Sequence, residues 1–275
     1  MMSEGRADRT RPGLPAPTSA RLAELAEGLR PPAEPEGFGE ATRLAALGVC
    51  DRIRSESRGG ELTEALAVLA HLRGGIDRLD PRTLLTRRGL GGLFDSRKRR
   101  LKAFRVRFAE ATRTLSESLD DLQIRIGALD RRSQVLDGLW ESMRVAAFDL
   151  DAYAALALHP SGPAPLVERG HRLADARDAA LRLLPSVRVI QNTDVQALHR
   201  LKLACEALIE WNADWTQALG MHVRKPKTIR PDQARLTTSR ETVLAMLDAA
   251  VREVELGRSR RIDEDGRMEQ ARRGL

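Results

Sequence analysis

The stretch LDDLQIRIGALDRRSQVLDGLWESMRVAAFDLDAYAALA, residues 119–157, decides the fold class. Apolar or small residues return in it at steps that alternate between three and four. The same alternation extends back to Phe104, with one additional four-residue step near Leu115. Such spacing places one apolar stripe along an α-helix, as in the heptad seams of coiled coils. The pattern predicts one long helix over residues 93–157, which the proline-rich turn at 159–163 must end.

Two further long helical patterns follow. The first covers residues 164–222, and the short turn before it predicts an antiparallel hairpin with the preceding helix. Pro185 lies inside this pattern, so we expect the helix to be broken there, by a kink or a division. The last pattern covers residues 239–272 after a linker over 223–238, and a capping box beginning at Thr238 marks its first turn.

The N-terminal part of the chain is less regular. Residues 1–39 contain six prolines and few large apolar side chains, which predicts a disordered tail with room for one short helix at 19–29. Residues 40–88 carry shorter helical patterns, which Gly74-Gly75 and other glycines separate. Asp80-Pro81 then starts a further short helix, with Asp as the N-cap and Pro in the first turn.

The composition supports a helical domain over residues 40–272. Ala, Leu, Arg and Glu dominate, aromatic residues make up 3% of the chain, and the longest run of strand formers is SVRVI at 186–190. We therefore expect an all-α fold, an elongated antiparallel helical bundle with coiled-coil-like long helices. No apolar run reaches the ~20 residues of a membrane span, and the N-terminus lacks an apolar leader core. We expect a cytoplasmic protein, with peripheral membrane contact as an alternative.

The last helical pattern is short relative to the hairpin before it. Its apolar stripe fades after Gly257, so that it covers only about half of the hairpin. The uncovered part of the seam must be buried by the N-terminal helices, by a second copy of the chain or by a different protein. This predicts protein partners or a homo-oligomer that forms through the uncovered seam.

The sequence contains no motif that points to catalysis. The five histidines form no HExxH motif and no i,i+4 pair, and neither Cys50 nor Cys205 has neighbours at metal-ligand spacing. Gly89, Gly91 and Gly92 precede a helix, but no strand leads into them and no Lys-Ser/Thr follows, which favours a hinge over a phosphate loop. We expect no enzyme activity, no cofactor and no metal site.

Nearly all of the net positive charge lies in one segment. Between Arg87 and Arg107 there are nine Lys or Arg residues and one acid, Asp95, so this segment has a charge of +8. The whole chain has a net charge of +7, which leaves about −1 for the rest. One interpretation is a helix surface that salt bridges neutralise. The other is an amphipathic patch for anionic lipid or an acidic partner protein, with nucleic acid the less expected ligand. The candidate patch comprises Arg97, Lys98, Arg99, Arg100, Lys102, Arg105 and Arg107.

Four polar residues interrupt the second long helical pattern and include the candidate functional motif Gln191, Asn192 and Asp194. If the alternation of three and four continues, Asp194 falls on the inward stripe and Gln191 lies beside it, one turn earlier. A carboxylate there costs several kcal/mol unless it is paired or hydrated. Three roles remain open: a buried group that sets the helix register, an Asp that satisfies backbone groups freed by Pro185, and a ligand site.

The same block carries a resemblance. The run PSVRVIQNTDVQALHRLKLACEALIEWNADWTQALGM, residues 185–221, resembles the most characteristic block of the TelA/KlaA family of toxic-anion (tellurite) resistance proteins. The similarity extends over roughly residues 60–260. Thr193 stands where the family has a second Asn, and residues 222–240 replace most of a long family helix. The matching positions are Pro185, Arg188, Ile190, Gln191, Asn192, Asp194, Trp215, Ala218, Leu219 and Gly220.

The resemblance implies a cytoplasmic bacterial protein that is associated with tolerance of tellurite or of agents that attack the cell envelope. It implies no established enzyme activity and no catalytic residues. We therefore expect a non-enzymatic helical protein that acts through protein partners or at the inner membrane face. The alternative is a basic-patch module for anionic lipid or nucleic acid. A direct tellurite-reducing enzyme, which would need accessible thiols or a redox cofactor, is the least expected.

Overall fold

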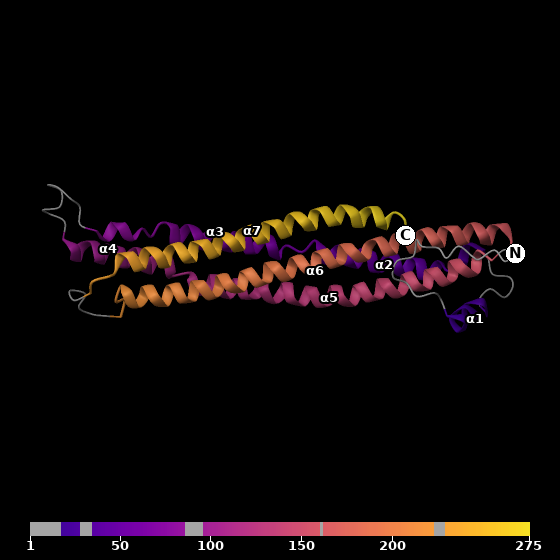
Figure 1. The fold of residues 1–275 in the computed structure, drawn as a ribbon, viewed down its shortest axis with the longest axis horizontal. Helices are drawn as coiled ribbons and strands as arrows, with labels where there is room; N and C mark the ends of the chain where they lie inside the picture. Colours follow the sequence, from indigo (N-terminus) through magenta and orange to yellow (C-terminus); the bar gives the residue numbers. More distant parts are fainter. Residues whose placement is uncertain (1–17, 28–34, 86–95, 160–161, 223–228) are drawn as a thin grey trace, which may run out of the picture. The chain divides into compact units, whose positions relative to one another are not determined.

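The computed structural model describes residues 18–27, 35–85, 96–159, 162–222 and 229–275 (Figure 1). All regular elements in these ranges are helical and none is a strand, which confirms the all-α prediction. The elements are α1 (Ser19–Glu27), η1 (Pro35–Gly37), α2 (Glu40–Ser57), α3 (Glu61–Asp77), η2 (Pro81–Leu84), α4 (Arg97–Thr112), α5 (Leu115–Ala157), α6 (Ala164–Ala218) and α7 (Gln233–Arg272).

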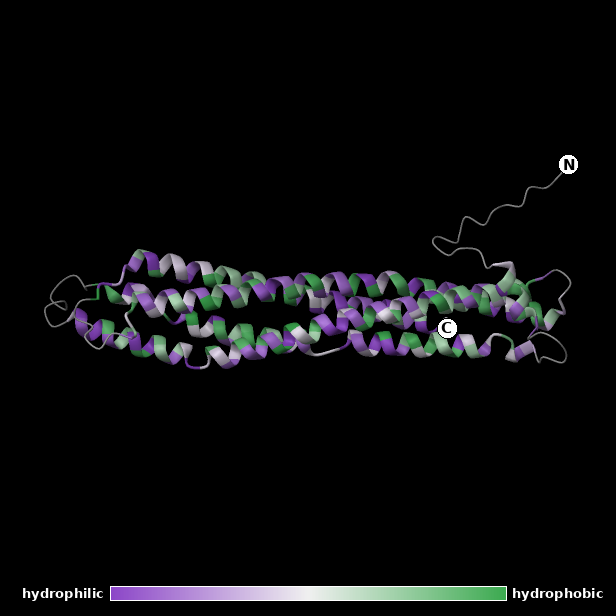
Figure 2. Ribbon diagram, turned by 90° about the horizontal axis from the view of Figure 1, so that it is seen from below, coloured by the Kyte–Doolittle hydropathy of each residue, from purple (hydrophilic) through white to green (hydrophobic). Residues whose placement is uncertain are grey.

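The chain divides into two compact units, and the three longest helices contribute residues to both. Unit 1 consists of residues 1–58, 135–189 and 263–275, and unit 2 consists of residues 59–134 and 190–262. Hydrophilic and hydrophobic residues alternate along each long helix (Figure 2), as an amphipathic pattern requires. Each unit therefore has an interior of its own.

The helix predicted over residues 93–157 is two helices, so this prediction is wrong at its N-terminal part. Residues 93–95 lie outside the described ranges, and a turn at Arg113 and Thr114 separates α4 from α5. The Arg113 N–H bonds the Glu110 carbonyl, and the Thr112 hydroxyl donates to the carbonyl four residues earlier at 2.9 Å. These bonds compete with the regular helical ladder. The turn coincides with the additional four-residue step in the apolar spacing.

Pro185 does not divide the second long helix, so the predicted division is wrong, while a kink at Pro185 stays a prediction. Helix α6 continues through it from Ala164 to Ala218. Pro185 lies on the exposed side of the helix. Solvent can therefore satisfy the carbonyl that the proline leaves without a donor. The seam of α6 consequently keeps its register past the proline.

The connection between α6 and α7 is shorter than predicted. Helix α6 ends at a left-handed Gly220 (φ 60°), and the Met221 N–H bonds the Thr216 carbonyl at 3.0 Å, as in a Schellman motif. Helix α7 begins at Gln233 and not at residue 239. Its N-terminal signal is Asp232, whose side chain accepts from the Arg235 N–H at 3.2 Å, so the predicted capping box lies inside the helix.

The N-terminal segments agree with the predictions in part. The short helix expected at residues 19–29 forms as α1, and Leu25 is buried while Arg21 bonds Asp149 at 2.9 Å. This piece is thus packed on unit 1, while residues 1–17 and 28–34 of the predicted tail lie outside the described ranges. Asp80 caps η2 as predicted, with its side chain accepting from an N–H two residues later at 2.9 Å. Gly74-Gly75 does not end α3, which continues to Asp77.

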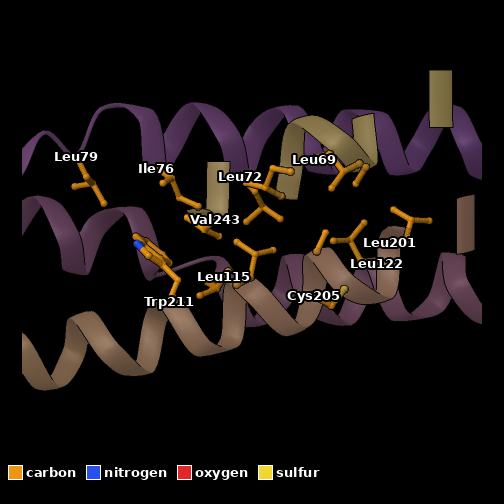
Figure 3. Packing of buried hydrophobic residues seen from close by; sticks show 14 of the residues in the cluster. Leu69, Leu72, Ile76, Leu79, Leu115, Leu122, Leu201, Cys205, Trp211 and Val243 are labelled. Carbon is orange, nitrogen blue, oxygen red and sulfur yellow. The ribbon is translucent and has the colours of Figure 1, made fainter. Parts of the chain in front are cut away.

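Large apolar and aromatic side chains fill unit 2. Leucines and isoleucines of α3, α5 and α6 point into the space between the helices (Figure 3). The Trp215 ring is fully buried and lies 5.8 Å from Phe104, 5.7 Å from Phe108 and 5.1 Å from Trp211, between ring centroids. The apolar face of α4 is therefore occupied by the interior of its own unit.

The interior of unit 1 is built differently. Alanine is its commonest buried residue, as at Ala146, Ala147 and Ala180. Arg177 of α6 bonds Asp151 of α5 at 2.7 Å. Nearer the other end of the hairpin, Arg188 bonds Asp137 at 2.5 Å. Residue numbers thus rise along α6 as they fall along α5, which confirms the antiparallel hairpin.

In unit 1 the N-terminal helices cover the part of the seam that the last helix was expected to leave uncovered. They are the first of the three predicted alternatives. Helix α2 buries Ala46, Cys50 and Ile53 completely. It also pairs with the end of α7, through Arg54 and Asp265 at 3.3 Å and through further ion pairs. The seam in unit 1 is therefore not available to a partner, which would have to bind at an exposed face of the helices.

Candidate functional site

The candidate motif lies on α6 and is divided between the interior and the surface. Gln191, Thr193 and Asp194 are 5%, 1% and 0% exposed, while Asn192 is exposed. This confirms the expected inward position of Asp194 and Gln191. The Gln191 amide donates to the Ser133 carbonyl of α5 at 3.0 Å. Gln191 therefore links α6 to α5.

Asp194 forms a buried ion pair with Arg261 of α7. Its Oδ1 atom accepts from the Arg261 Nε at 3.1 Å and from Nη2. The side chains are 0% and 6% exposed. Burial raises the pKa of Asp194, and the Arg261 guanidinium opposes that rise. The Oδ2 atom is buried with no hydrogen-bond partner in the described ranges. The pair holds α6 against α7 in a medium where an unpaired charge would be costly.

A second ion pair completes the cluster. Glu61, the first residue of α3, pairs with Arg132 of α5, whose side chain is 5% exposed. Burial is the largest influence on Glu61 and opposes its ionised form, but the hydrogen bonds from Arg132 and the backbone, together with the charges of Arg132 and Arg261, outweigh burial and lower the pKa of Glu61. Arg132 also acts on the pKa of Asp194. The charge cluster, Glu61, Arg132, Asp194 and Arg261, thus takes one residue from each of four helices, and its charges cancel.

Two glycines make room for the charge cluster. A Cβ atom at Gly59 would lie 1.8 Å from the Arg132 guanidinium. The Gly59 carbonyl accepts a hydrogen bond from Arg261 at 3.5 Å. A Cβ atom at Gly257 of α7 would meet the Thr193 methyl group at 3.1 Å. Helices α6 and α7 therefore approach closely beside the Asp194–Arg261 pair. This gives Thr193 a packing role.

The other three members of the charge cluster were not predicted from the sequence, although the sequence contains a signal for Arg261. The α7 stripe does not fade after Gly257, because charged residues continue its alternation. Arg261 stands on the inward stripe of α7 as Asp194 does on that of α6. The buried positions of α7 are Leu236, Val243, Leu247, Ala250, Val254, Gly257, Arg261, Glu264, Met268 and Ala271.

The candidate basic patch lies on α4, apart from the motif in the sequence and without a contact to it in the described ranges. Three of its members bond neutral groups. Arg97 donates to the Ile229 carbonyl at 2.9 Å, Arg105 donates to the Gly220 carbonyl at 2.9 Å, and Arg107 donates to a hydroxyl at 3.0 Å. Such contacts position the guanidinium groups but leave their charge uncompensated. The side chains of Lys98, Arg99 and Lys102 are exposed.

The other candidate chemistries find little support in the described residues. Burial raises the pKa of Cys50 and of Cys205 to about 11, and both thiols are free. In the described ranges no group of three or more His, Cys, Asp or Glu side chains is placed to hold a metal ion. The glycine-rich segment at 89–92 lies outside these ranges. None of the described helices is both long and apolar enough to cross a membrane.

No protein-family model, curated protein or solved structure matches this chain. The motif is therefore interpreted from its contacts within unit 2. Gln191 joins α6 to α5, and Asp194 joins α6 to α7.

Proposed function

We propose that this chain is a non-enzymatic helical scaffold that supports tolerance of tellurite or of envelope stress through a partner bound at its surface. The observation that carries the proposal is the placement of Asp194. Its carboxylate is fully buried against Arg261, where it joins helices and does not reach a ligand in solution. Buried polar groups of this kind fix the register of packed helices.

The two thiols support the same proposal. A thiol that reduces an oxyanion acts as an exposed thiolate of depressed pKa. Cys50 and Cys205 have the opposite properties, since both are buried and their pKa values are raised. The biological role itself rests on the family resemblance of residues 185–221.

The test is complementation of a deletion strain that is challenged with tellurite and with envelope-active agents. We expect the strain to be sensitive and the native gene to restore growth. A double variant, Asp194→Leu with Arg261→Met, should also restore growth, because it removes the ion pair while it keeps side-chain volume. Full tolerance of the deletion strain would contradict the biological role. A folded double variant that fails to complement would show that the carboxylate acts on a ligand.

A second candidate function is contact with an anionic membrane surface through α4. It is favoured by the exposed side chains of Lys98, Arg99 and Lys102 and by Val106, which is 59% exposed beside them. Lys98, Lys102 and Arg105 line a shallow depression of about 300 Å³ beside it. Phe104 and Phe108 face inward, so α4 offers no aromatic platform on which nucleic-acid bases could stack.

The second candidate is tested by sedimentation with vesicles that contain phosphatidylserine, across a salt series. Reversal of Lys98, Arg99 and Lys102 to Glu should abolish binding without disturbing the carbonyl contacts of Arg97 and Arg105. Reversal of three exposed arginines elsewhere, Arg52, Arg258 and Arg260, is the matched control with the same change in charge. Equal loss in both triple variants would contradict a specific patch, and binding to DNA but not to vesicles would replace lipid by nucleic acid.

A further inference from the structure

Two glycines in the last turn of α3, Gly74 and Gly75, have no packing reason to be glycine. Glycine is a poorer helix former than alanine, by up to about 1 kcal/mol in a helix interior. A Cβ atom at Gly74 would meet nothing within 4 Å, and at Gly75 its nearest neighbour would be the Ala111 carbonyl at 4.0 Å. Neither glycine has a positive φ. Their absent side chains instead leave space open between α3 and α4.

That space is a cavity of about 550 Å³ within unit 2. Its floor is apolar and includes the buried Leu72 and Leu79. Its rim is charged: three arginines against one carboxylate, Glu110, give a net charge of +2 with the histidine neutral. The charged and titratable rim residues are His71, Arg78, Arg107, Glu110 and Arg113.

The rim arginines are available to an anion. Arg78, Arg107 and Arg113 are exposed, and none of them forms a salt bridge with a carboxylate of the described ranges. Arg107 donates to the Thr83 hydroxyl, a neutral acceptor, at 3.0 Å. Guanidinium groups bind carboxylates in a fixed two-pronged geometry. The cavity thus combines an apolar floor with uncompensated donors at its mouth.

We propose that this cavity binds a small amphipathic anion of the fatty-acid class, with the carboxylate at the arginines and the hydrocarbon body over the glycines. The volume lies in the range of about 300–1,000 Å³ that is typical of small-molecule sites. An inorganic oxyanion would leave the apolar floor unused, and a neutral hydrocarbon would leave the arginines unused. The proposal goes beyond the scaffold function and does not depend on it.

The experiment uses the full chain with anilinonaphthalene sulfonate, an aromatic sulfonate whose fluorescence rises in apolar sites. We expect saturable binding that laurate displaces at least tenfold better than dodecanol, while inorganic phosphate at the same concentration does not displace it. The double variant Arg78→Gln with Arg113→Gln should lose the preference for laurate over dodecanol.

A filling variant separates binding from folding. Gly74→Leu places a side chain in the open space and replaces glycine by a better helix former, so it should fold at least as stably as the native chain. We expect its affinity for laurate to fall at least tenfold. Gly48→Leu, on the exposed face of α2 with nothing within 4 Å, is the matched control and should bind normally. Unchanged laurate affinity in a folded Gly74→Leu variant, or displacement of the dye by phosphate, would overturn the proposal.

Discussion

The two units use different interiors to hold similar long helices. Unit 2 packs leucines and four aromatic rings around a single charge cluster. Unit 1 packs small alanines and buries charged groups such as Asp151, Arg169 and Arg177 among them. Small side chains bury little apolar area, so less of the stability of unit 1 can come from the hydrophobic effect. The difference teaches that unit 1 depends more on its ion pairs, and hence on pH, than unit 2 does.

The largest effect is expected from a substitution that breaks the charge cluster of unit 2. Arg261→Met leaves Asp194 buried and unpaired, and we expect a loss of about 3–5 kcal/mol in the free energy of unfolding. Combining it with Asp194→Leu should recover most of that loss, because both charges are gone. Urea unfolding followed by circular dichroism measures both variants. Additive losses in the double variant would show that the two residues are not coupled.

A loss of similar or slightly smaller size is expected from the aromatic interior. Trp215→Ala removes a fully buried ring that contacts three others, which should cost about 3–5 kcal/mol. Ile209→Ala, at a position that is 55% exposed, is the control and should stay within about 0.5 kcal/mol of the native chain. The same urea titration applies. A cost below that of the control would contradict the apolar description of unit 2.

A smaller effect is expected from the ion pairs of unit 1. Asp151→Asn keeps the shape of a side chain that is 1% exposed but removes the charge that Arg177 faces at 2.7 Å. We expect a cost of about 1.5–3 kcal/mol, the range for hydrogen bonds to charged groups. Asp178, the other partner of Arg177, is 47% exposed, so Asp178→Asn should cost less than about 1 kcal/mol. Equal costs would show that burial does not control these pairs.

The smallest effect is a pH dependence that arises from Glu40 in unit 1. The hydrogen bond from Arg43, opposed by burial and reinforced by Arg169, lowers the pKa of Glu40 from 4.5 to about 2. The folded chain therefore holds fewer protons there than the unfolded chain, and the stabilisation present above pH 4.5 is lost as the pH falls towards 2. Glu40→Gln should flatten this part of the profile of urea midpoint against pH. Glu168→Gln, at a side chain that is 75% exposed, should leave the profile unchanged.

The fold class and the helical register were predictable because both follow from local periodicity. The alternation of three and four placed Asp194 on the inward stripe without any knowledge of its partner. The same alternation carried through α7 would have placed Arg261 inward as well. Because Arg261 is charged, its inward position does not appear as part of an apolar stripe. The pairing of α6 with α7 at this level is a long-range contact, which periodicity alone does not determine.

The errors at helix boundaries have local physical causes. Pro185 removes one N–H donor and its ring crowds the carbonyl four residues earlier, but on the exposed side of α6 solvent can satisfy that carbonyl and the helix continues. Gly74 and Gly75 cost stability but do not end a helix that tertiary packing supports. At the start of α7 two capping signals compete, and the helix begins after Asp232, about one and a half turns before the capping box at Thr238.

The two buried cysteines allow the opening of each unit to be measured separately. Cys50 lies in unit 1 and Cys205 in unit 2, and both are buried and protonated at neutral pH. A thiol reagent can reach each of them only when the structure around it opens. The two labelling rates therefore report the opening free energy of each unit in the native state, without a mutation and without denaturant. If the alanine-rich interior opens more readily, Cys50 will be labelled first.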